Sequence, residues 1–351
     1  MKKHIALLPG DGVGPEVINA AVTILDTISL KFEHEFTCSE ALIGGAAIDE
    51  VNDPFPKETE QLCLRSDAIL FGAIGDPKYD NDPTATVRPE QGLLKMRKTL
   101  GLYANVRPIQ TFSATLDKSP LKRSIVEGTD FIVIRELIGG IYFGERGRRK
   151  NGREAYDTSS YSITEIARVS KFAFELAEKR HRHLTLVDKA NVLETSRLWR
   201  ETVQHMSEEY PDVIVEYMFV DNASMQIIKN PTLFDVILTE NMFGDILTDE
   251  ASVITGSIGM LPSASIGEKT SLYEPIHGSY PKAAGKNSAN PIGTILSAAM
   301  MLEYSFKMTD EAQAIRHAVE KTLDAGYGTK DIVFESPLGT QELAEKIAQN
   351  I

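Results

Sequence analysis

The chain has 351 residues, of which 42% are hydrophobic and 25% are charged, and this composition excludes disordered and fibrous proteins. The length predicts two domains, because a single hydrophobic core stops growing at roughly 250–300 residues. The formal net charge of -13 argues against nucleic-acid binding, since an acidic surface repels phosphate backbones. An anionic substrate would therefore need a local group of arginines or lysines.

The cysteines and the hydropathy pattern indicate a cytoplasmic protein in a reducing compartment. Cys38 and Cys63 lack the spacing of metal or redox motifs, and both are expected to be buried thiols. No hydrophobic run approaches the ~20 residues that span a membrane. The apolar stretch after His4 is too short for the core of a signal peptide.

Short apolar runs alternate with longer amphipathic segments, which indicates an α/β protein with a largely parallel sheet. The predicted buried strands are, in chain order, Ile5–Leu8, Ala68–Ala73, Phe131–Ile134, Leu184–Val187, Val213–Val220 and Val236–Leu238. The clearest predicted helices are Glu16–Leu30, Thr164–Arg180 and Ser196–Tyr210. Because ligands bind beyond the carboxyl ends of such strands, the polar residues that follow the runs are the first candidates for chemistry.

The first run leads into a glycine-rich turn, Gly10-Asp11-Gly12-Val13-Gly14-Pro15. It resembles a dinucleotide-binding fingerprint, but the spacing is G-x-G-x-G rather than G-x-G-x-x-G, and a proline follows at once. Proline in the first turn of a helix is a helix-start signal. We therefore favour a tight turn into a helix over a Rossmann phosphate site.

A predicted helix further along the chain carries Glu90, Leu93 and Arg97 at spacings that place them on one face. Arg107 follows ten residues after Arg97, and Arg135 ends a predicted strand. Each arginine alone is typical of a solvated surface. Three converging arginines would instead bind two carboxylates through bidentate hydrogen bonds.

The segment Ile141–Tyr161 departs from the α/β pattern. It contains a basic run from Arg146 to Lys150, followed by Asn151-Gly152, a pair that is typical of hairpin turns. An isolated polar hairpin is barely stable in water. We therefore expect this hairpin to pair with a second copy of the chain, and a homodimer is the commonest arrangement of that kind.

Asp245 and Asp249 lie four residues apart, so on a helix their carboxylates share one face. Two like charges there destabilise the helix unless a cation lies between them, and oxygen ligands suit Mg²⁺ or Mn²⁺. Asp221, at the end of a predicted strand, is a candidate third ligand. The same spacing is also typical of a solvated helix face. Tyr142 and Lys189 likewise fit either chemistry or an ordinary packed tyrosine and a solvated lysine.

Five motifs, in order along essentially the whole chain, resemble the isocitrate/isopropylmalate β-decarboxylating dehydrogenase family. They are Leu8–Glu16, Arg135–Glu145, Asp188–Val192, Asn241–Asp249 and Glu274–Pro291. The resemblance implies a two-domain α/β fold that is not the Rossmann fold. It places a cofactor-binding domain at residues 1–102 and 256–351, a second domain at 103–255, and an intersubunit β-hairpin arm at about 141–161.

The resemblance also implies the site residues of a metal-dependent oxidative decarboxylase whose active sites are shared by two subunits. Lys189 would be the base for the substrate hydroxyl, Tyr142 would protonate the enol product, and Lys189 and Asp221 would come from the partner subunit. The full implied set is, for catalysis, Tyr142 and Lys189; for substrate, Arg97, Arg107, Arg135, Asp221, Leu93, Leu94 and Val192; and for Mg²⁺ or Mn²⁺, Asp221, Asp245 and Asp249.

The implied cofactor is NAD, with one departure from the family pattern at Lys282. NAD-specific relatives carry an aspartate there, which accepts hydrogen bonds from the adenosine ribose, and a lysine cannot. Lysine would attract a 2′-phosphate, yet the tyrosine that follows it in NADP-using relatives is Ala283 here, so NADP or dual use stays open. The implied cofactor residues are Glu90, Glu274, His277, Gly278, Ser279, Lys282, Ala289 and Asn290.

Leu93 and Leu94 favour an isopropyl group on the substrate, unless they are merely core residues. Relatives that act on isocitrate carry polar residues there, and burying a third carboxylate against two leucines would be costly. The expected reaction converts (2R,3S)-3-isopropylmalate to 4-methyl-2-oxopentanoate and CO₂ in leucine biosynthesis. The alternatives are isocitrate, homoisocitrate, tartrate or malate as substrate, or a non-catalytic regulatory subunit, although the catalytic and metal residues are all present.

Overall fold

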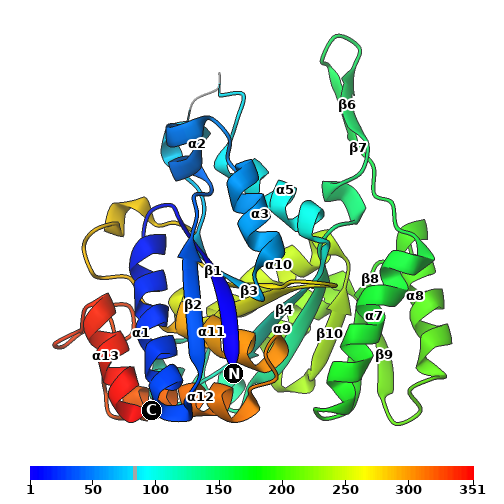
Figure 1. Cartoon of the computed structure of the whole chain (residues 1–351). Coiled ribbons are helices and arrows are strands. Elements are labelled where there is room, and N and C mark those ends of the chain that lie inside the picture. The colour runs from blue at the N-terminus through cyan, green and yellow to red at the C-terminus, as the bar shows by residue number, and fades with distance from the viewer. Residues whose placement is uncertain (82–84) are drawn as a thin grey trace. The chain divides into compact units, whose positions relative to one another are not determined.

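A computed structural model describes residues 1–81 and 85–351, which form two compact units (Figure 1). Unit 1 consists of Met1–Leu102, Phe112–Lys118 and Thr255–Ile351, and unit 2 of Tyr103–Thr111 and Ser119–Ile254. Both ends of the chain therefore belong to unit 1. The expectation from the sequence assigned all of residues 103–255 to the second domain, whereas Phe112–Lys118 lies with unit 1.

Unit 1 contains strands in the order β2-β1-β3-β12-β11. β1 pairs in parallel with β2 and β3, β12 is parallel to β3, and β11 is antiparallel to β12. The strands are β1 (Lys2–Gly10), β2 (Glu35–Glu40), β3 (Ala68–Ala73), β11 (Pro262–Gly267) and β12 (Leu272–Pro275). The helices are α1 (Gly14–Phe32), α2 (Gly45–Val51), α3 (Lys57–Arg65), α4 (Pro77–Asp80), α5 (Pro89–Leu100), α11 (Ile292–Tyr304), α12 (Thr309–Asp324) and α13 (Thr340–Asn350).

The core of unit 1 forms where helices cover strands that are apolar on both faces. Every residue of β3 is buried, and α11 is buried without interruption from Ile292 to Leu302. α11 packs against α1, α12 and the strands β11 and β12, and α1 lies beside α13 (Figure 1). Each large side chain buried in this way contributes about 1.5–3 kcal/mol, which explains why these unbroken apolar segments form the interior.

Unit 2 contains strands in the order β4-β5-β10-β8-β9, in which β4 is antiparallel to β5 and the remaining pairs are parallel. The strands are β4 (Leu102–Gln110), β5 (Asp130–Glu136), β8 (His183–Asp188), β9 (Ile214–Phe219) and β10 (Val236–Thr239). The helices are α6 (Arg123–Val126), α7 (Ile163–Glu178), α8 (Glu194–Ser207), α9 (Val220–Lys229) and α10 (Asn241–Ser252). The six predicted strands and three predicted helices are all confirmed, with shifts of a few residues at their ends.

Two predictions of burial are wrong, and both concern strands at the end of a strand order. The run Val213–Val220 was expected to be a buried strand, but no residue of β9 is buried and half of them are exposed. Cys38, expected to be buried, is an exposed residue of β2, whereas Cys63 is buried as predicted. A strand with a neighbour on one side is covered less completely than a central strand, so apolar composition alone overestimates its burial.

The hairpin predicted from Asn151-Gly152 is confirmed. β6 (Arg146–Arg149) pairs antiparallel with β7 (Glu154–Asp157), and Asn151 and Gly152 both adopt the positive φ that this turn requires. The hairpin projects from unit 2 in Figure 1. Tyr142, within the arm expected at about 141–161, precedes the hairpin and ends a short 3₁₀ turn that begins at Gly140. Pairing of the hairpin with a second chain stays a prediction.

Candidate active site

The predicted arginine of β5, Arg135, is almost fully buried, with 3% of its side chain exposed. Its Nε and Nη2 atoms donate to Asn241 Oδ1 over 3.0 and 2.8 Å, and its Nη1 atom donates to Asp245. β5 places Arg135 opposite Thr239 of β10, so the carboxyl ends of these parallel strands bring the guanidinium to the start of α10. A buried guanidinium held on two sides is a rigid anchor for an anionic group.

Asp245 and Asp249 both lie on α10, as the spacing predicted. Asp245 Oδ2 accepts from the Tyr142 hydroxyl at 2.8 Å. Burial would raise the pKa of Asp245, but Arg135, the Tyr142 hydrogen bond and Arg107 outweigh it and hold that pKa below its usual range. Burial and the bond to Asp245 raise the pKa of Tyr142, so its hydroxyl keeps its proton at neutral pH.

Arg107 of β4 reaches the same helix from the neighbouring strand. Its Nε atom donates to Asn105 Oδ1 at 2.7 Å, and its Nη1 atom donates to Thr248 Oγ1 at 2.6 Å and Asp249 Oδ1 at 3.3 Å. The Asp249 side chain is 72% exposed, so this carboxylate keeps most of its surface open to solvent. Two of the three predicted arginines therefore adjoin the two predicted metal ligands of α10.

Lys189 and Asp221 form a separate pair, with 2.5 Å between Lys189 Nζ and Asp221 Oδ1. This hydrogen bond lowers the pKa of Asp221. Lys189 directly follows β8, and its backbone N–H donates to Ser196 Oγ at 3.0 Å. The buried Asp188 carboxylate accepts from the backbone N–H of Ala190 and from two nitrogens of Arg200. The loop that carries Lys189 is thus fixed on both sides of the lysine, and Val192 on the same loop is 61% exposed.

Helix α5 of unit 1 carries the remaining predicted substrate residues. Its buried face consists of Gly92, Met96 and Leu100, so Leu93 and Leu94 are not core residues. Leu94 is 37% exposed. Arg97 Nη2 lies 3.4 Å from Glu274 Oε1, and within residues 1–81 and 85–351 no group accepts a hydrogen bond from the buried Arg97 Nε. Glu90, at the start of the helix, is exposed.

The glycine-rich turn after β1 leads directly into α1, as the sequence predicted, and it is also bonded to the loop after β12. Gly10 and Gly12 have φ of 69° and 59°, and a side chain at Gly12 would collide with the Ser279 carbonyl. The N–H of Val13 donates to that same carbonyl at 2.8 Å. The Asp11 carboxylate, whose role the sequence did not reveal, accepts N–H hydrogen bonds from Gly45 and Ala46 at the start of α2 and from Gly75 after β3.

The loop after β12 contains most of the predicted cofactor residues and has features that fit a ligand. His277 Nδ1 lies 2.9 Å from the Gly278 carbonyl oxygen, whereas the buried His277 Nε2 has no partner among the described residues, and burial lowers the pKa of this imidazole. A Cβ added at Gly278 would meet open space. A buried ring nitrogen left without a partner among the described residues is a feature that a bound ligand would satisfy.

The rest of the predicted cofactor set divides into packed and open positions. Ala289 belongs to a buried cluster with Val13, Val17 and Ala283, so it joins this loop to α1. The Asn290 side chain accepts from the Ile292 N–H and donates to Asp331, so it stabilises the local backbone. Lys282 is exposed.

The acidic residues supply the hard oxygen ligands that Mg²⁺ and Mn²⁺ prefer, so Asp245 and Asp249 fit a metal in chemistry and spacing. Within residues 1–81 and 85–351, no group of three acidic, histidine or cysteine side chains lies close enough to hold a metal ion. Asp221, the predicted third ligand, is paired with Lys189.

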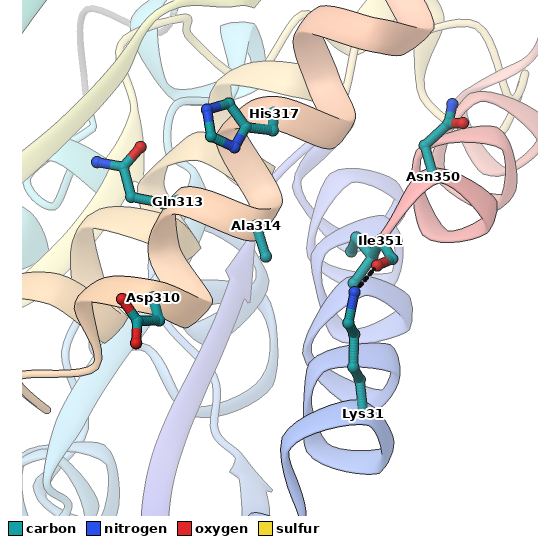
Figure 2. Close-up of a pocket in the computed structure, with 7 residues that line it drawn as sticks. All are labelled: Lys31, Asp310, Gln313, Ala314, His317, Asn350 and Ile351. Atoms are coloured by element: carbon teal, nitrogen blue, oxygen red, sulfur yellow. Dashed lines mark hydrogen bonds between the residues drawn. The ribbon is translucent and has the colours of Figure 1, made fainter.

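A pocket of about 350 Å³ lies elsewhere in unit 1, between the ends of α1 and α13 and the first half of α12 (Figure 2). The Lys31 ammonium group donates to the backbone oxygen of Ile351 at its edge. The pocket is lined by Lys31, Asp310, Gln313, Ala314, His317, Asn350 and Ile351. None of the predicted site residues is among them, so we do not assign the chemistry to this pocket.

No helix in the described part of the chain is long and apolar enough to cross a membrane.

Comparison with known proteins decides the family. The sequence matches the isocitrate/isopropylmalate dehydrogenase family over residues 4–347. The chain belongs to the isocitrate/isopropylmalate dehydrogenase family. It is 54% identical to the 3-isopropylmalate dehydrogenase of Bacteroides fragilis strain YCH46 over 353 residues, which cover 100% of this chain and 99% of that protein. It is 55% identical to the 3-isopropylmalate dehydrogenase of Aquifex aeolicus strain VF5 over 357 residues, covering 100% and 98%.

Solved structures of the family share the fold. The isocitrate dehydrogenase from Methylococcus capsulatus has a TM-score of 0.88 and 32% identity, with 99% of both chains covered. A β-decarboxylating dehydrogenase from Thermococcus kodakarensis in its apo form has a TM-score of 0.82 and 34% identity, covering 99% of this chain and 96% of that one. The family resemblance and the α/β fold predicted from the sequence are therefore confirmed.

Proposed function

We propose that the chain is a metal-dependent 3-isopropylmalate dehydrogenase, which oxidises (2R,3S)-3-isopropylmalate and releases CO₂ to give 4-methyl-2-oxopentanoate in leucine biosynthesis. The observation that carries the proposal is the group formed by Arg135, Tyr142 and Asp245, in which a buried cation, a protonated hydroxyl and a carboxylate meet. This group supplies an anion anchor, a proton donor and a metal ligand, three of the functions that oxidative decarboxylation of a hydroxy acid needs beside a base and a hydride acceptor.

Exposed apolar side chains on α5 and on the loop after Lys189 support an apolar substituent on the substrate. Leu94 is 37% exposed on a helix whose buried face lies elsewhere, and Val192, on the loop after Lys189, is 61% exposed. Large apolar side chains left open beside charged site residues fit an isopropyl group, whose burial would be favourable. A third carboxylate would lose its hydration there without gaining a partner, so isocitrate fits less well.

The chain's own residues account for substrate binding and proton movement. Arg97, Arg107 and Arg135 are proposed to bind the two carboxylates, and Lys189 of the partner subunit to take the hydroxyl proton at Nζ. The Tyr142 hydroxyl keeps its proton at neutral pH and can donate this proton to the enol carbon. A divalent cation held by Asp245, Asp249 and the partner's Asp221 would stabilise the negative charge that develops as CO₂ leaves.

NAD is the proposed hydride acceptor, bound by the loop from Glu274 to Asn290 with Glu90 near the nicotinamide. In the described part of the chain, His277 Nε2 has no partner and nothing fills the space beside Gly278, which supports a cofactor there. Lys282 leaves NADP as the alternative, because a lysine attracts the 2′-phosphate that distinguishes the two cofactors. We further propose a cytoplasmic homodimer in which the hairpin of β6 and β7 joins the subunits.

The test is an initial-rate assay of cofactor reduction with 3-isopropylmalate, isocitrate, malate and tartrate, each with NAD and NADP, and with or without Mg²⁺ or Mn²⁺. The highest kcat/KM is expected with 3-isopropylmalate and NAD, and turnover should be lost on treatment with a chelator and return on adding metal. A higher kcat/KM with isocitrate or malate would contradict the proposed substrate, and one with NADP would contradict only the proposed cofactor.

A further inference from the structure

We propose that Tyr161 and Asn241 are positioning residues that together hold Arg135 and the turn carrying Tyr142 in their reactive places. Neither residue was assigned a role above. The inference rests on the proposed function, because it assumes that Arg135 binds substrate and that Tyr142 donates a proton. The contacts that carry it all lie within unit 2.

Asn241 is the centre of the arrangement, with 1% of its surface exposed at the start of α10. Its Oδ1 atom accepts from Nε and Nη2 of Arg135, so the guanidinium is gripped at two points and cannot rotate about its long axis. Its Nδ2 atom donates to the Gly139 carbonyl oxygen at 3.2 Å. One amide side chain therefore fixes both the substrate arginine and the turn that leads to Tyr142.

Tyr161 contacts both Asn241 and the turn that leads to Tyr142. Its hydroxyl accepts from the Asn241 backbone N–H at 3.0 Å. Its ring lies against bare backbone, because a Cβ at Gly139 would stand 2.7 Å from the ring and one at Gly140 would stand 2.3 Å from the hydroxyl oxygen. The ring is itself held edge-on by Trp199, with 5.4 Å between the ring centroids.

The turn transmits this support to the reactive hydroxyl. Gly140, with φ of 72°, begins the 3₁₀ turn that ends at Tyr142, and its N–H donates to the Ser160 carbonyl next to Tyr161. The Glu136 carboxylate accepts from the N–H groups of Ile138 and Gly139. Fixed in this way, Tyr142 reaches Asp245 at 2.8 Å. A small displacement of the turn would lengthen that bond, and misplacement by about 1 Å can reduce turnover 100-fold.

The main experiment compares Tyr161→Phe with Tyr273→Phe, two variants that each remove one hydroxyl from a buried tyrosine. Tyr273 is fully buried in β12 of unit 1, where its hydroxyl bonds to Ser305 Oγ at 2.7 Å. Its side chain points to the opposite face of the strand from Glu274, because successive strand residues alternate. Both variants should lower the melting temperature by similar amounts, so stability alone cannot separate them.

Catalysis should separate the two variants. For Tyr161→Phe we expect kcat/KM with 3-isopropylmalate to fall about 10- to 100-fold, with KM raised and kcat lowered, and KM for NAD unchanged. Isothermal titration calorimetry should show substrate binding weakened about tenfold without turnover. Tyr273→Phe should match the wild type in all of these quantities. Wild-type kcat/KM in Tyr161→Phe, or equal losses in both variants, would overturn the positioning role.

A second variant, Asn241→Ala, removes the grip on Arg135 and the bond to Gly139 together, and should reduce kcat/KM more than Tyr161→Phe does. Full activity in folded Asn241→Ala would overturn the proposal. Thr239→Val is its matched control. Thr239 is also buried, two residues before Asn241, and within the described residues its hydroxyl bonds only to the Val187 carbonyl oxygen. If the wild type prefers another acid, the proposed substrate fails, and the same comparisons are made with that acid.

Discussion

At the scale of single residues, the proposed chemistry depends on side chains whose backbones are fixed. Lys189 is the clearest case. The backbone N–H of Lys189 donates to Ser196 Oγ, and the N–H of the next residue, Ala190, donates to the Asp188 carboxylate. Two nitrogens of Arg200 also donate to that carboxylate and hold it in place. The Lys189 side chain is left 27% exposed and contacts Asp221. A rigid backbone with an accessible amine suits a base that must meet a substrate hydroxyl.

Lys189→Ala is expected to reduce kcat by at least about 100-fold, because general-base catalysis contributes that much or more. Fluorescence titration should show unchanged NAD binding, and the melting temperature should change little, since a partly exposed ion pair is worth ~1 kcal/mol or less. Lys171→Ala, which removes another lysine facing a glutamate across 3.9 Å on α7, is the matched control and should keep wild-type turnover. Near-normal turnover in Lys189→Ala would remove this lysine from the mechanism.

At the scale of elements, two parallel strands bring buried carboxylates together at their carboxyl ends. Glu136 ends β5 and Glu240 follows β10, with 0% and 7% of their surfaces exposed. Burial, and for Glu240 also the charge of Glu136, raises the pKa of each carboxyl group to about 7. The folded protein therefore holds protons that the unfolded chain would release near pH 4.5, so this pair costs stability as the pH rises.

Glu240→Gln should stabilise the protein, and the gain should grow with pH. The raised pKa of Glu240 means that its protonated form is favoured in the folded state, so the cost appears as pH rises from about 4.5 to about 7 and then levels off. Urea unfolding of both proteins at pH 5 and pH 8 should show an advantage that increases by on the order of 1–3 kcal/mol. An advantage that is equal at the two pH values would contradict the raised pKa.

The strands and helices with regular patterns could be predicted from the sequence, whereas the contacts between them could not. β3 coincides with its predicted range, because the run from Ala68 to Ala73 contains no polar or charged side chain and all of it is buried. β4 was not predicted, since its polar residues Asn105 and Arg107 are buried only through contacts with other elements. The partners of Asn241 are likewise distant in sequence, so its position after a strand marked it as a candidate without showing its role.

At the scale of the whole molecule, unit 2 of each chain carries two separate groups of proposed site residues. One contains Arg135, Tyr142 and Asp245, and the other contains Lys189 and Asp221. We propose that the second group of one chain completes the first group of its partner. The net charge of -13 makes the buried and paired arginines the local means of attracting a dianionic substrate.

The most direct test of this account isolates a heterodimer of Lys189→Ala and Asp245→Asn chains that carry different affinity tags. Each variant alone should be nearly inactive, because both of its sites lack one required side chain. In the heterodimer one site contains both substitutions and the other contains neither, so it should show about half of the wild-type activity with 3-isopropylmalate. A heterodimer as inactive as its parents would contradict an active site shared between two chains.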